Sequence, residues 1–176
     1  MIVSTLGDSI TEGSPGETSW QHFAALKHPG LQFRNHGIHS QRTDEILARF
    51  DEAVDGADAL VVQGGINDIF QGHQVEPAAA NLREMVRRGK ALGLRVALAN
   101  VLPWNNGWPD AEPKVRRLNE LVAEIARDED VPLLQFHDTL EDPNRPGRMK
   151  AEWTFEGNHP SVEGYRLLGE LAFRVP

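Results

Sequence analysis

The chain has 176 residues, 40% of them hydrophobic, which is enough for one domain with a buried core, so we expect a single domain over residues 1–176. It has no cysteine, which excludes disulfides, a thiolate nucleophile and cysteine-bound metals. The net charge is -8 with dispersed lysines and arginines, which disfavours nucleic acids and anionic membranes as partners and favours a small neutral substrate. Because no leader-like segment opens the chain and no apolar run reaches membrane-spanning length, we expect a cytoplasmic protein.

Apolar runs alternate with helix-like segments along the whole chain. The runs predict strands at residues 2–6, 31–35, 59–63, 95–101 and 132–136. Between them, apolar residues recur at helical spacing, as in Leu82, Met85 and Val86. Such alternation predicts βαβ units and a parallel sheet with helices on both faces. The expected fold class is therefore α/β, a three-layer α/β/α sandwich with a flavodoxin-like five-stranded parallel sheet.

A serine follows the first predicted strand, and a histidine lies near the other end of the chain. The strand runs into Gly7-Asp8-Ser9, and Gly7 permits a sharp turn that could expose the Ser9 hydroxyl. A serine nucleophile needs a base and a group that orients the base, and His159 and Glu156 are suitable types. Two plainer interpretations remain: Ser9 and Glu12 fit a helix capping box, and His159 could be a simple loop residue before a helix.

Polar loops follow the first three predicted strands. They contain Ser9, the segment Asn35-His36-Gly37 and the segment Gly64-Gly65-Ile66-Asn67-Asp68. Because the carboxyl ends of parallel strands meet at one edge of the sheet, where ligands bind in open α/β folds, we expect these loops to lie together.

Four blocks in this order resemble the SGNH or GDSL hydrolases. Ser9, Gly37, Asn67 and His159 stand in the order, and at about the spacing, of the family's motif blocks. The resemblance implies that Ser9 is the nucleophile and His159 the base. It also implies an oxyanion hole made by the Ser9 amide, the Gly37 amide and the Asn67 side chain. Glu156 would orient the base, in the position where the family usually carries Asp.

The match extends from Gly7 to Tyr165 with two departures. Glu156 is one methylene longer than the usual Asp, so its contact with His159 requires another rotamer or backbone path. Ser40 stands where the second block often carries a further glycine, which affects the path of that loop. Asp138, after the last predicted strand, is an alternative orienting acid.

The oxyanion assignment of Asn67 also has a physical basis. Ester hydrolysis builds negative charge on the carbonyl oxygen, and preset donors stabilise that charge where it appears. Asn67 supplies an amide donor without a charge of its own, although it could instead cap a helix.

Aromatic and histidine residues raise two further hypotheses. Trp104 and Trp108 follow the fourth predicted strand and could wall a substrate pocket, or simply pack within their loop. His36 and His39 could suggest a metal, but two imidazoles without a third ligand make an incomplete site. We therefore expect no metal and no cofactor.

These observations predict a metal-independent serine carboxylic-ester hydrolase, an esterase that acts through an acyl-enzyme. The expected substrate is a small or short-acyl ester, such as an acetylated sugar or a general ester. The alternatives are a lysophospholipase or thioesterase that acts on longer acyl chains, and a non-catalytic binding module of the same fold. An α/β-hydrolase is disfavoured because the chain has no Gly-x-Ser-x-Gly elbow.

Overall fold

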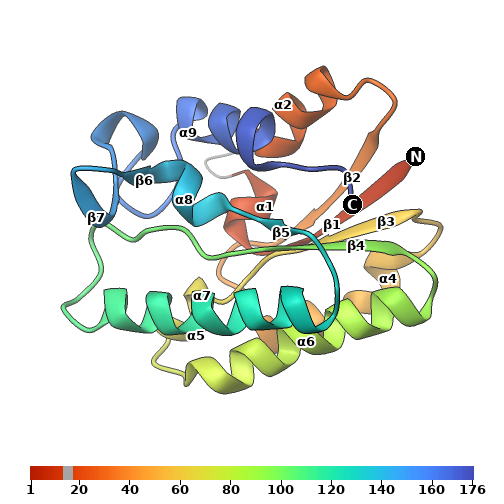
Figure 1. Cartoon of the computed structure of the whole chain (residues 1–176), viewed down its shortest axis with the longest axis horizontal. Coiled ribbons are helices and arrows are strands. Elements are labelled where there is room, and N and C mark those ends of the chain that lie inside the picture. The colour runs from red at the N-terminus through yellow and green to blue at the C-terminus, as the bar shows by residue number, and fades with distance from the viewer. Residues whose placement is uncertain (14–17) are drawn as a thin grey trace.

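The computed structural model describes residues 1–13 and 18–176 and contains a five-stranded parallel sheet between two layers of helices (Figure 1). The strand order is β2-β1-β3-β4-β5, the flavodoxin-like order. The strands are β1 Ile2–Gly7, β2 Gln32–Gly37, β3 Ala59–Val62, β4 Arg95–Ala99 and β5 Leu133–Leu134. The α/β/α sandwich expected from the sequence is therefore confirmed.

The two layers of helices lie on opposite faces of the sheet. The long helices α6 (Val75–Ala91) and α7 (Ala111–Asp128) cover one face, and α2 (Trp20–Lys27) and α9 (Val162–Leu167) cover the other (Figure 1). The shorter helices are α1 Ser9–Glu12, α3 Thr43–Ala48, α4 Phe50–Val54, α5 Ile66–Phe70 and α8 Phe136–Leu140. The remaining elements are the hairpin of β6 (Glu141–Asp142) and β7 (Arg145–Met149), the 3-10 turn η1 (Ala151–Trp153), and the π-helical turn η2 (Leu168–Ala172) that continues α9.

The sheet separates two apolar clusters. Along β3, Leu60 and Val62 face α6 and α7, whereas Ala59 and Val61 face the other layer, as the two-residue period of a strand requires. All four residues are buried, which is typical of a strand covered on both sides. The predicted helical stripe of Leu82, Met85 and Val86 lies in the first cluster with no exposed surface. Trp20, Phe136, Tyr165 and Phe173 are the largest side chains of the second cluster.

The fourth strand ends earlier than the sequence predicted. The backbone of Val101 leaves the sheet because the Asn119 side chain of α7 takes both of its polar groups. Val101 N donates to Asn119 Oδ1 at 2.7 Å, and Asn119 Nδ2 donates to Val101 O at 2.9 Å. This side chain turns the chain away from β4 and starts the loop that carries the tryptophans.

Helix α1 lies unusually close to the end of β2. The register pairs Gly7 of β1 with Gly37 of β2, and a Cβ atom at Gly37 would lie 2.0 Å from the backbone nitrogen of Glu12. Such a distance is far below van der Waals contact, so a side chain at position 37 would push α1 away. Gly37 therefore helps to fix the position of α1, which begins with Ser9.

Among the described residues, no helix combines the length and the apolar character needed to cross a membrane.

Candidate active site

Ser9 is the first residue of α1, directly after β1. The N-cap of α1 is Asp8, whose side chain accepts a hydrogen bond from the Ile10 amide at 3.0 Å. The capping-box interpretation of Ser9 therefore does not hold, because another residue fills that position. Glu12 does not reach back to Ser9 either; its carboxylate accepts from the His39 amide at 3.1 Å. The Ser9 hydroxyl is left for a different contact.

That contact is with His159. Ser9 Oγ lies 3.0 Å from His159 Nε2, and His159 Nδ1 lies 2.8 Å from Glu156 Oε1. A proton on Nδ1, donated to the carboxylate, leaves Nε2 free to accept the serine proton. The three side chains thus form a continuous chain from a hydroxyl through an imidazole to a carboxylate.

The longer side chain of Glu156 is accommodated by a tight turn. Glu156 Oε1 also accepts from the backbone amides of Asn158 at 3.0 Å and His159 at 2.7 Å. Gly157 has a φ of +100°, a conformation that favours glycine. The carboxylate therefore folds back over its own turn and is held by two amides while it contacts the imidazole. Asp138, the alternative orienting acid, lies instead next to His137, with 3.5 Å between its Oδ1 and His137 Nδ1.

Asp8, directly before Ser9 in the chain, is fully buried. Desolvation by burial raises the pKa of Asp8 from 3.8 to about 6, against the opposing effects of the Ile10 amide, the Gln63 side chain and the charge of His159. Ionisation of the Asp8 carboxyl group is therefore less favourable in the folded protein than in water.

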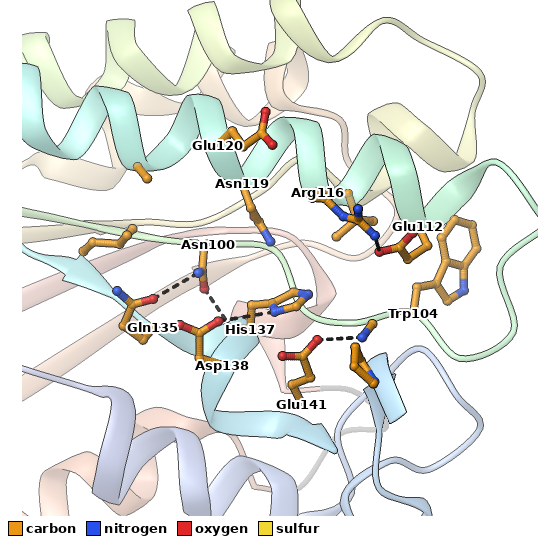
Figure 2. Close-up of a pocket in the computed structure, with 15 residues that line it drawn as sticks. Asn100, Trp104, Glu112, Arg116, Asn119, Glu120, Gln135, His137, Asp138 and Glu141 are labelled. Carbon is orange, nitrogen blue, oxygen red and sulfur yellow. Dashed lines mark hydrogen bonds and ion pairs between the residues drawn. The ribbon is translucent and has the colours of Figure 1, made fainter. Parts of the chain in front are cut away.

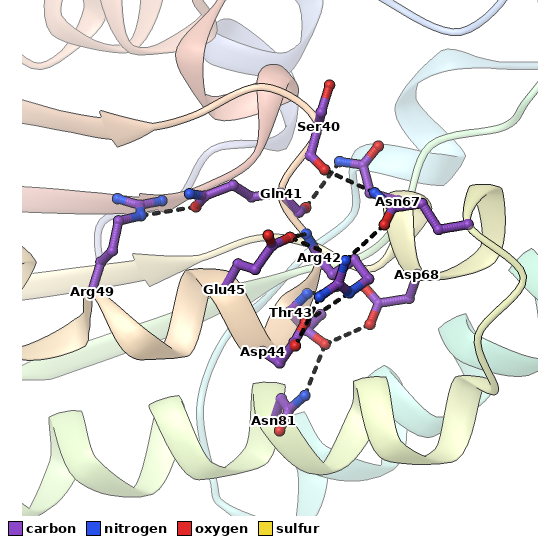
Figure 3. Close-up of polar contacts among 11 residues, drawn as sticks. Ser40, Gln41, Arg42, Thr43, Asp44, Glu45, Arg49, Asn67, Asp68 and Asn81 are labelled. Atoms are coloured by element: carbon purple, nitrogen blue, oxygen red, sulfur yellow. Dashed lines mark hydrogen bonds and ion pairs between the residues drawn. The ribbon is translucent and has the colours of Figure 1, made fainter.

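Asn67 lies in the first turn of α5, which follows β3, the neighbour of β1 in the sheet. The N-cap of α5 is Gly65, with a φ of +119°, so Asn67 does not cap this helix. Its Nδ2 atom donates to the Gln41 carbonyl at 2.9 Å (Figure 3). An amide NH2 group has two hydrogens, so one donor remains for another acceptor.

The Gly37 amide has a different partner from the one expected. It donates to Asn35 Oδ1 at 2.9 Å. The expected role of Gly37 in an oxyanion hole does not fit this contact, because its single N–H already has an acceptor. Ser40, three residues later, has a φ of +64° and sits beside Asn67 (Figure 3). Neither the Ser40 amide nor the Ser9 amide makes a hydrogen bond to any described residue.

A buried carboxylate, that of Asp68, ties the Ser40 loop to α5, and the sequence analysis assigned it no role. Asp68 Oδ2 accepts from the Thr43 amide at 3.0 Å, and its Oδ1 accepts from the Thr43 hydroxyl at 2.8 Å (Figure 3). Asn81 of α6 donates to the same hydroxyl at 3.0 Å. Asp68 is 4% exposed, and burial raises its pKa while the Thr43 hydrogen bonds oppose this shift. The only hint in the sequence was an acid directly after Asn67.

An aromatic cavity adjoins His159. It has a volume of about 340 Å³ and is lined by Phe70, Trp104, Asn106, Trp108, Glu156, Asn158 and His159. The rings of Trp104 and Trp108 have centroids 5.0 Å apart, and Phe70 lies 5.7 Å from Trp108. Phe70 is 55% and Trp108 39% exposed, although large aromatic side chains are usually buried. Both predicted tryptophans thus lie beside the histidine, together with Phe70, which the sequence did not single out.

The two histidines considered as metal ligands do not form such a site. His39 Nδ1 lies 3.2 Å from Glu12 Oε2. Burial and the nearby Arg49 lower the pKa of His36. Neither histidine belongs to a group of three close potential ligands in the part of the chain that the structure describes.

A Ser–His–carboxylate chain is the arrangement with which serine hydrolases activate a hydroxyl, and here it lies at the carboxyl edge of a flavodoxin-like sheet. The sequence profile of the GDSL-like Lipase/Acylhydrolase family matches residues 5–167, and the chain belongs to this family. The resemblance inferred from the four motif blocks is thereby confirmed, and with it an esterase or acylhydrolase type of enzyme.

Solved structures share the fold over nearly the whole chain. A G-D-S-L family protein from Desulfitobacterium hafniense is 25% identical with a TM-score of 0.85, and the match covers 96% of this chain and 95% of that one. A GDSL-like lipase from Bacteroides thetaiotaomicron is 26% identical with a TM-score of 0.80, over 97% and 84% of the two chains. An acetylxylan esterase from Geobacillus stearothermophilus, at 20% identity and a TM-score of 0.80 over 96% and 90%, shares the fold. No curated protein matches the chain with significant similarity.

Proposed function

We propose that the protein is a serine carboxylic-ester hydrolase that acts through an acyl-enzyme on short-acyl esters. The observation that carries the proposal is the contact chain from Ser9 Oγ to His159 Nε2 and from His159 Nδ1 to Glu156 Oε1, at 3.0 and 2.8 Å. This arrangement activates a hydroxyl that is otherwise a weak nucleophile. It also argues against a non-catalytic binding module, which has no need for a base aligned on a serine.

The reaction has two halves. As Ser9 Oγ attacks the ester carbonyl carbon, His159 Nε2 takes the hydroxyl proton, and the carbonyl electrons move to the oxygen. The tetrahedral intermediate collapses, and the leaving alkoxide receives the proton from His159. A water molecule then attacks the acyl-enzyme with His159 as base, which releases the acid and restores the Ser9 hydroxyl. Glu156 keeps the required tautomer and stabilises the imidazolium in both halves.

The oxyanion hole is proposed to consist of the amides of Ser9 and Ser40 and the side chain of Asn67. Ser40 replaces Gly37 in this assignment, because the Gly37 amide donates to Asn35 whereas the Ser40 amide has no described partner. The left-handed φ of +64° at Ser40 is unfavourable for a residue other than glycine. Such a conformation is expected where a backbone amide must face a functional site.

The substrate class is inferred from the cavity beside His159. A cavity of about 340 Å³, with the partly exposed side chains of Phe70 and Trp108 in its lining, accommodates a small ring or a short chain. Aromatic faces favour flat, partly apolar groups, such as the face of an acetylated sugar. We therefore place short-acyl esters, acetylated sugars among them, ahead of the longer chains of a lysophospholipase or thioesterase.

The serine mechanism is tested by Ser9→Ala, with Ser19→Ala as the matched control. Ser19 precedes α2 and its side chain caps nothing. Hydrolysis of p-nitrophenyl acetate should fall by at least about 10³-fold in Ser9→Ala and stay unchanged in Ser19→Ala. A fluorophosphonate should label the parent at Ser9, as located by peptide mapping. A folded and fully active Ser9→Ala would refute the mechanism.

The substrate class is tested separately by the length of the acyl chain. We expect kcat/KM to be highest for acetyl esters and to fall through butyrate to octanoate, with acetylated xylose and acyl-CoA measured alongside. A preference for octanoate or acyl-CoA would contradict the short-acyl proposal and leave the serine mechanism intact.

A further inference from the structure

A second cavity lies at the same edge of the sheet but belongs to different elements. Its volume is about 490 Å³, and it lies between α7, α8 and the β6–β7 hairpin (Figure 2). Asn100, which follows β4, and Gln135 and His137, which follow β5, line it. Neither Ser9 nor His159 lines it; Trp104 is the wall that it shares with the aromatic cavity. Because ligands of open α/β folds bind beyond the carboxyl ends of the strands, its position suits a binding site.

Three potential metal ligands converge in this cavity. One donor atom each from His137, Asp138 and Glu141 lie within 4.8 Å of one another (Figure 2). His137 and Glu141 are four residues apart, at the start and the C-cap of α8, and this spacing places two side chains on one face of a helix. His137 Nδ1 and Asp138 Oδ1 are 3.5 Å apart. Two donors at such a separation can bind a common ion that has bonds of about 2.0–2.2 Å.

The backbone around these side chains is held in place. The His137 amide donates to Asn100 Oδ1 at 2.8 Å, which anchors the start of α8 to the end of β4. Glu141 Oε1 accepts from the Gly147 amide of β7 at 2.6 Å, which leaves the second carboxylate oxygen available. Contacts that fix the orientation of a ligand strengthen metal binding, because less freedom is lost when the ion binds.

The charge of the cavity favours a cation. Its acidic lining residues are Glu112, Glu120, Asp138 and Glu141, and Arg116 is the one Lys or Arg among the described lining residues. Arg116 is itself engaged by Glu112 in an ion pair. A concave surface lined mainly by one sign of charge concentrates counter-ions. Without a cation, the carboxylates of Asp138 and Glu141 repel each other.

We infer that His137, Asp138 and Glu141 form a binding site for a divalent transition-metal ion, separate from the hydrolytic site. A mixed set of one imidazole and two carboxylates suits Zn²⁺ and its neighbours better than Ca²⁺ or Mg²⁺, which prefer oxygen ligands. The ion would link α8 to the first residue of the β6–β7 hairpin. Proposed hydrolysis by Ser9 and His159 does not involve it.

Binding at this site would also reinforce the loop that carries the proposed base. Met149 at the end of β7 exchanges two hydrogen bonds with the Asn105 side chain, and the Asn105 amide donates to the Gly157 carbonyl at 2.7 Å. The hairpin is thereby connected to the turn between Glu156 and His159. The ion is expected to raise the thermal unfolding temperature without acting on the ester.

The test is a titration of the full chain with Zn²⁺ after removal of metal with EDTA and dialysis. Isothermal titration calorimetry should find one ion per chain, with weaker binding of Mg²⁺. Glu141→Gln and Asp138→Asn should each weaken Zn²⁺ binding by about tenfold or more, and His137→Ala by about 100-fold. Removal of groups that only support metal ligands lowers metal affinity by about 10- to 100-fold, so removal of a ligand should cost at least as much. His22→Ala is the matched control, because His22 is an exposed histidine on α2. The affinity of the His22→Ala variant for Zn²⁺ should equal that of the parent protein.

Two results would overturn the inference. One is the absence of Zn²⁺ binding at millimolar concentration in the parent. The other is binding that survives both His137→Ala and Asp138→Asn, which would place the ion elsewhere. The carboxylate of Asp138 is largely exposed, so Asp138→Asn should fold even if His137→Ala does not, as checked by circular dichroism of the metal-free proteins. None of these measurements depends on ester hydrolysis.

Discussion

The two halves of the proposed active site are built in different ways. In the base half, the orienting carboxylate and the imidazole are three positions apart, and one exposed turn holds them. In the oxyanion half, Asn67 contacts Gln41, 26 positions away, and the buried carboxylate of Asp68 contacts Thr43, 25 positions away. The base half depends on a local turn and the oxyanion half on tertiary structure. Variants in the two halves should therefore fail differently.

The largest effect is expected in the base half. Glu156→Gln removes the charge that stabilises the imidazolium and should lower kcat roughly 10²- to 10⁴-fold. Glu156→Asp should keep more activity than Glu156→Gln, because the charge remains although the carboxylate retracts by one methylene. Glu163→Gln is the control, since this exposed acid pairs with Arg166 on α9. Steady-state kinetics that rank Glu156→Gln level with the control would show that the carboxylate does not orient the base.

A smaller loss is expected at Asn67, the proposed oxyanion donor. Asn67→Ala should lower kcat by roughly 10²- to 10³-fold with little change in KM, because the amide acts on charge that develops after the substrate binds. Asn67→Asp should be at least as damaging, since it brings a negative charge to the same position. If Asn67→Ala has the kcat of the parent, the Asn67 side chain has only a structural role, as the donor to the Gln41 carbonyl.

A substitution of Asp68 distinguishes the two halves most clearly, because it should lower the stability of the fold as well as kcat. Asp68→Asn leaves one of the two Thr43 donors without an acceptor, so unfolding free energy should fall by about 1–3 kcal/mol. The substitution should also loosen the Ser40 loop and displace the proposed oxyanion donor, the Ser40 amide. Because a small displacement of such a group lowers the rate, kcat should fall by roughly tenfold. Urea denaturation and kinetics measure the two effects. Asp51→Asn, on the exposed surface of α4, should change neither.

The last effect concerns stability alone, through pH and Asp8. Because burial raises the pKa of Asp8 to about 6, the folded state holds a proton that the unfolded state has already released. The contribution of Asp8 to stability is present below about pH 4 and is lost as the pH rises through about 6. It amounts to about 3 kcal/mol over this window. Asp8→Asn should remove this slope in urea denaturation between pH 4 and 7, and parallel curves would contradict the prediction.

The order of strands and helices was predictable from the sequence because it depends on local periodicity. Buried runs such as Ala59–Val62 and helical stripes such as Leu82, Met85 and Val86 are set by neighbouring residues. The three-residue spacing of Glu156 and His159 is local in the same sense. The match of the motif blocks also led to the family, because the order of functional residues along the chain is itself a property of the sequence.

The partners of those residues depended on contacts between distant segments. Asn35 Nδ2 donates to the Glu12 carbonyl of α1 at 3.2 Å, and Asn35 Oδ1 accepts from the Gly37 amide, so the partner of this amide depends on how α1 packs on β2. Phe70 joins Trp104 and Trp108 only because α5 and the loop after β4 lie at one edge of the sheet.

The sequence by itself therefore determined the layers of the fold, the family and the types of residue that we propose to carry the chemistry. The tertiary structure decided which amide is free to act as a donor, which carboxylate supports the proposed oxyanion side and which acids gather around His137. The physical reason is that periodicity and turn preference act over a few residues. Hydrogen bonds and charge clusters, in contrast, are satisfied by whichever segments the packed core brings together.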